Sequence, residues 1–324
     1  MSDRYARQEI LPEVGAAGQA RLGRATVLVV GAGGLGCAVL QYLTAAGVGR
    51  LIIVDHDRVE ESNLHRQPLY RMSDIGQPKV QAARAALAAL NPGTEIEAVC
   101  ERLSSVNAGS LVQSASVVID AADSFAVTYL LSDTCQGVGK PLVSASVLGL
   151  AGYVGVFCGG APSYRAVFPE LPRSAGSCAE SGVLGTAVGV LGTLEAHLAL
   201  ALLLDWQPPV RGRMLSLDLR TLHVGAFSFA AASEPTQAPI PFIAPAEVEA
   251  SDVVIDLRSL SETPVSPFAS ALRIEVEALE HTPLEVPGGA RIVLCCRSGL
   301  RAWRAARELR GRGHQRLALI ALGE

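Results

Sequence analysis

The 324-residue sequence is poor in charged and aromatic residues and has no surplus of positive charge. Asp, Glu, Lys and Arg together make up 18% of the chain, Phe, Tyr and Trp make up 5%, and the formal net charge is -4. The missing basic surplus argues against a general nucleic-acid-binding protein, and the scarcity of aromatic rings argues against stacking platforms for single strands. With 49% hydrophobic residues, the chain can bury a large core and is not disordered.

The sequence also lacks a secretory leader and a clustered, even set of cysteines. Residues 1–14 are charged without an apolar stretch, and the seven Cys are scattered along the chain. These features predict a reduced, cytoplasmic protein. Residues 182–204 are apolar and long enough to span a bilayer, but they include Glu195 and His197. We therefore expect a buried or subunit-interface helix there and no membrane partner.

Apolar runs alternate with helical patterns in the first half of the chain. We predict buried strands at 26–31, 51–55, 95–100, 116–123 and 141–146, and helices at 35–46, 78–90, 106–114 and 126–138. This alternation is typical of an α/β fold with a doubly wound, Rossmann-like and mostly parallel sheet. The later part is predicted to hold hairpin strands at 153–160 and 163–168, a long helix at 182–204, and strands at 213–218 and 221–228.

A second, smaller α/β unit follows a change in composition. Residues 230–246 are rich in Ala, Pro and small polar residues, and we predict that they link a domain of residues 1–229 to a domain of residues 247–324. The second domain is predicted to hold strands at 252–259, 290–298 and 316–322 and a helix at 300–312.

A glycine-rich loop ends the first predicted strand and begins the first long helix. Its glycines are Gly31, Gly33, Gly34 and Gly36. Glycines in this context let the backbone approach a phosphate, and the helix N-terminus supplies oriented N–H groups. Asp55 ends the second strand, where a carboxylate commonly holds ribose hydroxyls. By itself this motif indicates a nucleotide and does not separate ATP from NAD.

Six motifs occur in register over residues 4 to about 228. They are RYARQ (4–8), GAGGLG (31–36), DHDRVEESNLHRQ (55–67), IGQPKVQAA (75–83), DAADS (120–124) and SCAESGVLG (177–185). Together they resemble the ubiquitin-activating E1-like superfamily, in particular the bacterial MoeB/ThiF adenylyltransferases. The resemblance implies an E1/ThiF fold and an enzyme that uses ATP and Mg²⁺ to adenylate the C-terminal glycine of a ubiquitin-like sulfur carrier protein ending in Gly-Gly. It also implies that Arg7 reaches into a partner subunit's site, and hence a homodimer.

The residues in these motifs suit that chemistry. Forming an acyl-adenylate requires cations beside the phosphates of ATP and a metal ion to spread the developing charge. Arg66 and Lys79 are the predicted cations, and Asp123, at a strand end, is the predicted Mg²⁺ ligand. The other polar candidates are Asn63 and Gln67 and, as a ribose or metal contact, Asp57.

The zinc ligands of close relatives are missing. Those relatives carry two CxxC pairs that hold a tetrahedral structural zinc ion. In this chain the first pair falls at Ser163 and Ala166, and residues 219–241 hold no second pair. Neither a hydroxyl nor a methyl group can replace a thiolate ligand, so we predict no structural zinc. The segment that zinc would anchor must then be held by packing or be mobile.

Cys178 lies in the SCAESGVLG motif, among small and polar residues. The resemblance implies that its thiol joins the carrier's C-terminus or helps to resolve an acyl disulfide. Not all members of the family need this thiol, so a structural role stays open. We expect the remaining cysteines of the first domain to be small buried hydrophobes, namely Cys37, Cys100, Cys135 and Cys158.

Cys296 ends a predicted strand, and the loop CRSGLR (296–301) runs from it into a helix. A thiolate there faces backbone N–H groups and a helix N-terminus, which lower a thiol pKa. This loop and the DLRS segment at 256–259 resemble an abbreviated rhodanese-like sulfurtransferase domain over residues 240–324. The resemblance implies a persulfide on Cys296, with Arg297 and Arg301 offsetting its charge and Cys295 as a buried neighbour.

The combined expectation is a cytoplasmic, homodimeric enzyme in which a Cys296 persulfide attacks the acyl-adenylate and leaves a thiocarboxylate. A cysteine desulfurase or thiosulfate is the candidate sulfur donor, and the pathway, such as molybdopterin or thiamin biosynthesis, stays open. Three alternatives remain: an NAD(P) oxidoreductase with the same fold, an enzyme that adenylates another peptide carboxylate beside an inactive second domain, and a docking scaffold. The oxidoreductase leaves Arg7, Arg66 and Lys79 without roles.

Overall fold

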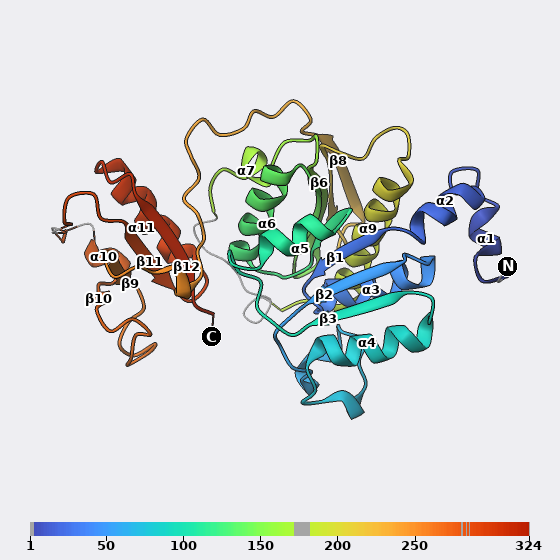
Figure 1. The fold of residues 1–324 in the computed structure, drawn as a ribbon, viewed down its shortest axis with the longest axis horizontal. Helices are drawn as coiled ribbons and strands as arrows, with labels where there is room; N and C mark the ends of the chain where they lie inside the picture. Colours follow the sequence, from blue (N-terminus) through green and yellow to red (C-terminus); the bar gives the residue numbers. More distant parts are fainter. Residues whose placement is uncertain (1–2, 172–181, 280, 283, 285, 324) are drawn as a thin grey trace.

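The computed structural model describes residues 3–171, 182–279, 281–282, 284 and 286–323, and the strands of these residues form two sheets (Figure 1). The larger sheet has the order β3-β2-β1-β4-β5-β6-β7-β8 and the smaller has the order β10-β9-β11-β12. The eight strands of the larger sheet are β1 (Thr26–Val30), β2 (Arg50–Val54), β3 (Glu95–Val99), β4 (Val117–Asp120), β5 (Pro141–Leu148), β6 (Ala151–Cys158), β7 (Arg213–Asp218) and β8 (His223–Ser228). The four strands of the smaller are β9 (Val253–Asp256), β10 (Leu272–Arg273), β11 (Ile292–Cys296) and β12 (Leu317–Ala321).

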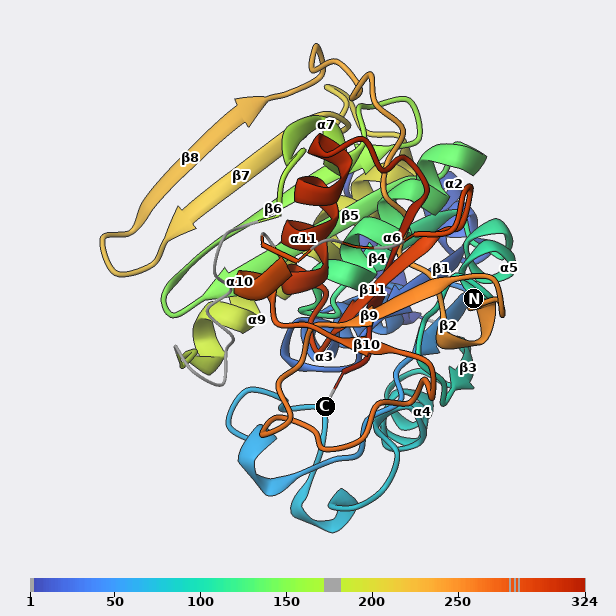
Figure 2. The same cartoon turned by 90° about the vertical axis from the view of Figure 1, so that its left-hand side faces the viewer.

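The first five strands of the larger sheet are parallel, as the strand–helix alternation predicts. Val27 on β1 is in register with Leu51 on β2 and with Val117 on β4. The sheet then becomes antiparallel from β5 to β8. Figure 2 shows β7 and β8 as a long hairpin at the sheet's outer edge. The α/β fold class predicted from the sequence is confirmed.

Helices cover both faces of the parallel strands. Successive residues of a strand point to opposite faces, so Val27 and Val29 pack against one helix layer while Leu28 and Val30 pack against the other. The first layer holds α3 (Gly34–Ala46), α4 (Lys79–Leu90) and α9 (Gly185–Leu204), and the second holds α5 (Ala108–Ser114) and α6 (Phe125–Val138). The other helices of the described residues are η1 (Asp3–Tyr5), α1 (Ala6–Glu9), α2 (Gly15–Leu22), η2 (Glu61–Asn63), η3 (Met72–Asp74), α7 (Tyr164–Val167), η4 (Pro245–Glu247), α10 (Val276–Leu279) and α11 (Leu300–Gly311).

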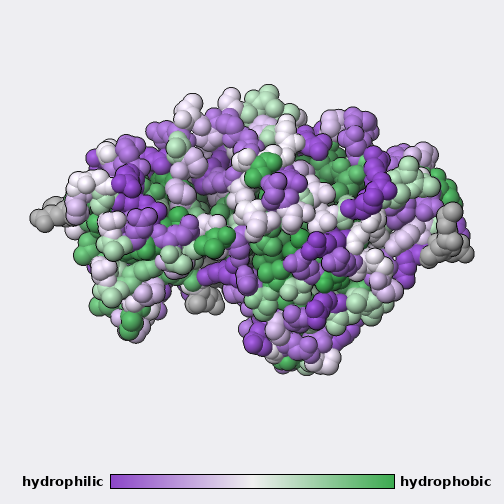
Figure 3. Space-filling model, viewed as in Figure 1, coloured by the Kyte–Doolittle hydropathy of each residue, from purple (hydrophilic) through white to green (hydrophobic). Residues whose placement is uncertain are grey.

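Helix α9 accounts for the apolar stretch near residues 182–204. Among the described residues it is the one helix that is long and apolar enough to cross a membrane by length and composition, and 56% of its most apolar window is buried. It packs along α3 and against β5 and β6. Glu195 in its middle is fully buried, and burial raises the pKa of this carboxyl well above its ordinary value. The face shown in Figure 3 intersperses apolar and polar residues over both units.

Two local predictions are wrong. Residues 163–168 do not form a strand, because Ser163 caps the short helix α7 by accepting a hydrogen bond from the Ala166 N–H at 3.2 Å. The hairpin partner of β6 is β5 instead. Cys100 follows β3 and is exposed, whereas Cys37, Cys135 and Cys158 are buried as expected.

Ser163, one of the two positions compared above with a zinc-binding CxxC pair, contacts the segment that follows β8. The backbone N–H and the hydroxyl of Ser163 donate hydrogen bonds to the Glu234 carboxylate, at 2.7 Å and 2.6 Å. Gln136 on α6 donates to the same carboxylate at 3.3 Å. The Glu234 carboxylate therefore ties the segment that follows β8 to Ser163 and to α6 of the first unit.

The smaller sheet and α11 pack against the first unit through polar and aromatic contacts. The Arg165 guanidinium lies 4.6 Å from the ring centre of Tyr129 and 5.7 Å from that of Trp303 on α11. Arg307 on α11 forms an ion pair with Glu170 at 2.6 Å. One cluster of buried apolar residues runs through both units. The end of the chain lies between them (Figure 1).

Candidate functional site

A cavity of about 260 Å³ lies at the carboxyl edge of the parallel strands. Parallel strands end at one edge of a sheet, and ligands bind there in folds of this class. The cavity is lined by ten of the residues that the sequence singled out: Gly31, Gly33, Gly34, Asp55, Asp57, Asn63, Arg66, Gln67, Lys79 and Asp123. Gly36 lies one turn further along α3. Cys178 lies outside the described residues.

Two glycines of the loop have different surroundings: Gly36 is tightly packed, whereas Gly33 borders open space. A Cβ atom on Gly36 would lie 2.0 Å from the Gly31 carbonyl oxygen, so close packing between loop and helix requires glycine there. A Cβ atom on Gly33, the N-cap of α3, would meet only the Gln67 amide nitrogen at 3.8 Å. Protein packing does not demand a glycine at position 33, and the open backbone beside a helix N-terminus suits a phosphate group.

Asp55 holds the loop in place. Its carboxylate accepts hydrogen bonds from the Ala32 N–H and the Asp57 N–H, each at 2.7 Å. A carboxylate has about four lone-pair sites, so two of them are left to accept ribose hydroxyls, as the sequence predicts. The side chain therefore shapes the loop and can contact a nucleotide as well.

Lys79 is already paired inside the cavity. Its Nζ lies 2.8 Å from the Asp57 carboxylate, and its side chain is 7% exposed. Burial raises the pKa of Asp57, the hydrogen bond and charge of Lys79 lower it, and the net pKa lies below its ordinary value. A bound polyphosphate would compete with Asp57 for this ammonium group and leave Asp57 free to contact a divalent cation.

Asn63 connects the other two polar candidates. Its side-chain oxygen accepts hydrogen bonds from Arg66 Nη2 and from Gln67 Nε2, each at 3.1 Å. The Gln67 Oε1 atom is buried and has no hydrogen-bond partner among the residues that the structure describes. The sequence placed these three residues in one motif, and the structure shows that they form one network beside the glycine loop.

Asp123 lies in a strained turn, and the buried carboxyl of Asp120 lies behind that turn. Its φ of 49° is in the left-handed region, which side chains other than glycine rarely adopt and which is often retained at functional sites. Behind it, Asp120 is 2% exposed, and burial raises the pKa of its carboxyl to about 6. Thr128 and Ser144 donate hydrogen bonds to Asp120 at 2.6 Å and 2.9 Å. Sequence reasoning missed this support, although Asp120 begins the DAADS motif.

Arg7 lies far from its own chain's cavity. It is exposed on α1. This segment packs at the C-terminal ends of α3 and α4, away from the carboxyl ends of the parallel strands. Gln8 donates to the Ala46 carbonyl at the end of α3 at 3.0 Å, and the Tyr5 hydroxyl accepts from Asn91 at 2.7 Å. The structure therefore does not bring Arg7 together with Lys79 and Asp123 within one chain.

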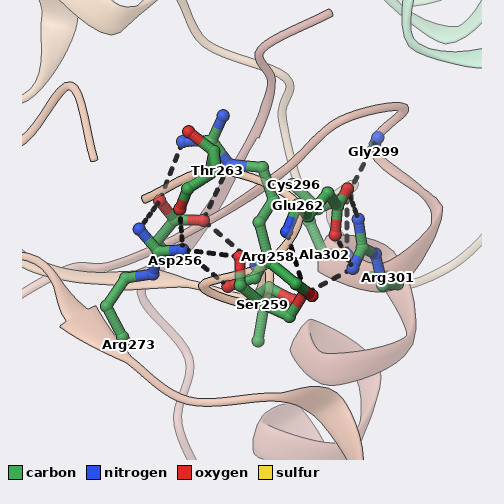
Figure 4. Close-up of polar contacts among 12 residues, drawn as sticks. Asp256, Arg258, Ser259, Glu262, Thr263, Arg273, Cys296, Gly299, Arg301 and Ala302 are labelled. Carbon is green, nitrogen blue, oxygen red and sulfur yellow. Dashed lines mark hydrogen bonds and ion pairs between the residues drawn. The ribbon is translucent and has the colours of Figure 1, made fainter. Parts of the chain in front are cut away.

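The second unit holds Cys296 at the carboxyl end of β11, beside two backbone N–H groups of the loop and helix that follow (Figure 4). Its Sγ accepts hydrogen bonds from the Gly299 N–H at 3.1 Å and the Ala302 N–H at 3.4 Å, and the residue is fully buried. Cys295 points the other way into a small apolar cluster, where burial raises its pKa to about 12.

Ion pairs fix the loop around Cys296 (Figure 4). Arg301 donates to the Glu262 carboxylate and, at 3.2 Å, to the Leu257 carbonyl. On the neighbouring strand the buried carboxylate of Asp256 accepts from Arg258 at 2.8 Å. The Asp-x-Arg segment therefore stabilises the turn that receives Arg301. Arg297 is exposed.

Comparisons with known proteins match the part of the chain that contains the first site. The ThiF family profile matches residues 5–238, which end before the second sheet begins. A sulfur carrier protein adenylyltransferase of Thermus thermophilus is 48% identical over 67% of this chain and 83% of that protein. The SAMP-activating enzyme E1 of Haloferax volcanii is 43% identical over 67% of this chain and 81% of that protein.

The adenylyltransferase and sulfurtransferase MOCS3 of Bos taurus is 49% identical over 66% of this chain, and the match spans about half of that protein, 48%. Among solved structures, E. coli MccB with MccA-N7isoASN superposes with a TM-score of 0.64 at 19% identity, over 73% of this chain and 74% of that chain. PaaA superposes with a TM-score of 0.59 at 22% identity, over 70% and 73%. These two likenesses concern the fold. With its profile match over most of the chain and the motif residues gathered in one cavity, the chain belongs to the ThiF family.

Proposed function

We propose that the protein uses ATP to adenylate the C-terminal glycine carboxylate of a ubiquitin-like sulfur carrier protein. The observation that carries the proposal is the single cavity that holds an open helix N-terminus at Gly33, two cations at Arg66 and Lys79, and an exposed carboxylate at Asp123. These are the groups that phosphoryl chemistry on a nucleoside triphosphate needs. The names of the Thermus and Haloferax relatives support this activity.

Different residues of the cavity would bind the phosphates, the ribose and the metal ion of ATP. The N–H groups at the start of α3 and the Arg66 and Lys79 side chains bind the phosphates, while Asp55 accepts from ribose. Asp123, with Asp57 once Lys79 turns to the phosphates, would hold Mg²⁺, which supplies charge neutralisation. The carrier's carboxylate oxygen attacks the α-phosphorus, and the bond to pyrophosphate breaks. An acyl-adenylate and pyrophosphate result.

Arg7 is proposed to act on the neighbouring subunit's site in a homodimer. The support is its position: α1 packs near the ends of α3 and α4 that lie away from the chain's own cavity. Among the described residues this exposed guanidinium has no hydrogen-bond or ion-pair partner, and a twofold arrangement would let each subunit supply a cation to the other. A cytoplasmic location belongs to the same proposal.

Sulfur transfer by the second unit, taken as residues 247–324 beyond a linker at 230–246, is the finer part of the proposal. A cysteine desulfurase or thiosulfate would load a persulfide on Cys296. The outer sulfur attacks the acyl-adenylate carbonyl and AMP leaves, which gives an acyl disulfide. A second thiol, with Cys178 as the candidate, attacks the Cys296 sulfur, and the carrier leaves as a thiocarboxylate while a Cys178–Cys296 disulfide remains. The N–H groups of Gly299 and Ala302 around Sγ support this role.

The test combines ATP, Mg²⁺, thiosulfate and a Gly-Gly-ending carrier, and follows the carrier by intact mass spectrometry. The expected product is the carrier with one oxygen replaced by sulfur, lost in Cys296→Ala and retained in the matched control Cys295→Ala. Adenylation without sulfur would leave an adenylating enzyme with an inactive second unit. No adduct and no ATP–pyrophosphate exchange with any carrier would overturn the proposal in favour of a scaffold or an oxidoreductase.

A further inference from the structure

A second cavity of about 260 Å³ continues from the first. The two share Gly31, Asp55, Asp57 and Ala122, so they meet at the carboxylate proposed to hold ribose. The first cavity is lined by the glycine loop and the cations, whereas the second has a largely apolar lining. Its apolar residues from the first unit are Val30, Val54, Leu103, Ala122, Ala126, Val127 and Leu130. A nucleotide with its phosphates in the first cavity and its ribose at Asp55 would place its base in the second.

The outer wall of this second cavity does not come from the first unit. It is formed by Phe242, Ile243, Ala244 and Pro245, which lead into the smaller sheet, and by Ala321 at the end of β12. Phe242 pairs with Leu319 on β12 as an isolated bridge, and Ile243 donates to the Leu319 carbonyl at 2.9 Å. The wall is therefore an added edge of the smaller sheet.

Polar contacts hold this wall against the first unit. The Ala244 N–H donates to Ser105 Oγ at 2.8 Å and to the Glu247 carboxylate at 2.7 Å, and Ser105 donates to the same carboxylate. Arg102 donates to the Leu322 carbonyl at 2.8 Å. Ser105 and Arg102 follow β3, so the loop that borders the proposed base subsite also carries the second unit.

One side chain touches both sites. Phe242 lines the second cavity and is 6% exposed. A Cβ atom on Gly299 would lie 2.7 Å from a carbon of the Phe242 ring, so the ring lies directly on the backbone of the Cys296 loop. The N–H of the same Gly299 donates to Cys296 Sγ. A single phenyl ring thus separates the loop that surrounds the thiol from the proposed base subsite.

We propose that Phe242–Pro245 complete the base subsite of the nucleotide cavity, so that bound ATP clamps the second unit onto the first and rigidifies the Cys296 loop through Phe242. This proposal rests on the proposed function, because it takes a nucleoside triphosphate as the ligand. It predicts two couplings. Changes in the second unit should alter the affinity for the base but not for the phosphates, and binding of the base should alter the reactivity of the Cys296 thiol.

The experiment compares two probes in the full-length protein by calorimetric titration with Mg²⁺: a non-hydrolysable ATP analogue and inorganic triphosphate, which has no base. Phe242→Leu is expected to weaken the ATP analogue about five- to tenfold and to leave triphosphate affinity unchanged. Glu247→Ala, which loosens the wall without lining the cavity, should weaken the analogue about threefold. Phe268→Leu, at a half-buried phenylalanine of the smaller unit's other cluster, is the matched control and should change neither.

A second readout follows Cys296 alkylation by peptide mass spectrometry, with the exposed Cys100 as an internal reference. The ATP analogue should slow alkylation of Cys296 severalfold in the unmodified protein and not in Phe242→Leu. Unchanged affinity for the analogue in Phe242→Leu, or an equal loss for analogue and triphosphate, would overturn the clamp and leave the adenylating function intact. Binding of neither probe by the unmodified protein would overturn the proposed function and the clamp together.

Discussion

The two units each hold functional groups at the carboxyl ends of parallel strands, but they differ in how far those groups are exposed. In the first, the functional groups are charged and turned toward a cavity, and Asp123 occupies a strained conformation that exposes it. In the second, the thiol of Cys296 is fully buried and the surrounding arginines are paired with carboxylates. The first site is therefore open for a ligand, whereas the thiol of the second is closed off from solvent, and the proposed sulfur transfer would require that loop to open.

The largest expected effect is the loss of ATP–pyrophosphate exchange at the first site without loss of sulfur transfer at the second. Lys79→Ala removes a buried cation and leaves Asp57 without its partner, so ATP–pyrophosphate exchange should fall about 10²–10³-fold. Lys140→Ala, at the other lysine of the chain, which donates to the Ala115 carbonyl, is the control. Sulfur transfer from thiosulfate to cyanide should stay unchanged in both variants. A parallel loss of both activities in Lys79→Ala would show that the sites are not separate.

The next effect concerns the buried support of the first site and depends on pH. Burial raises the pKa of Asp120 from 3.8 to about 6, so the folded protein binds this proton more tightly than the unfolded chain does. The stabilisation is fully present below pH 3.8 and is lost as the pH rises through about 6, by at most roughly 3 kcal/mol. Asp120→Asn should flatten this part of the pH dependence in urea unfolding. Asp205→Asn, at an exposed turn, should leave the slope as it is, and an identical slope in Asp120→Asn would contradict the prediction.

A smaller effect is expected at the junction between the units. Ser163→Ala removes the cap of α7 and a hydroxyl that donates to Glu234, which should lower the free energy of unfolding by about 1–2 kcal/mol. Ser110→Ala, at an exposed serine, is the control. Chelators should change the stability of neither protein. Stabilisation by added zinc would instead show that a metal site exists at this junction.

The smallest effect probes how the second site opens. Glu262→Gln weakens the ion pair that holds Arg301 beside the Cys296 loop, so alkylation of Cys296 by iodoacetamide should become about threefold to fivefold faster. Glu170→Gln, which weakens the more exposed ion pair with Arg307, should leave the rate unchanged. Equal rates in all three proteins would mean that Arg301 does not hold the loop closed.

Much of the first site could be predicted because its residues stand in local motifs. Gly33 and Asp123 follow the carboxyl ends of β1 and β4, and Lys79 begins the helix that follows β2, so the parallel order of these strands brings all three to one edge. Prediction was weaker where contacts are nonlocal. The Lys79–Asp57 pair and the Asp120 support depend on the approach of separate strands and helices, for which no single motif gives a signal.

The same distinction explains the errors. Residues 163–168 have an apolar, alternating pattern, yet the Ser163 cap and its contact with Glu234, 71 residues away, select a helix. Cys100 was expected to be buried because cysteines usually are. It is exposed because it directly follows β3, which is the edge strand of the larger sheet opposite β8.

The sequence by itself determined the α/β alternation, the glycine loop, the motif set of the ThiF family and the Cys296 loop, because each is encoded within a few residues or by a regular period. Tertiary structure alone decided which charges pair in the cavity, that Arg7 lies away from it, and that Phe242 lies between the second cavity and Gly299. Those arrangements arise when segments distant in the chain pack together, and their energies depend on burial and distance rather than on residue order.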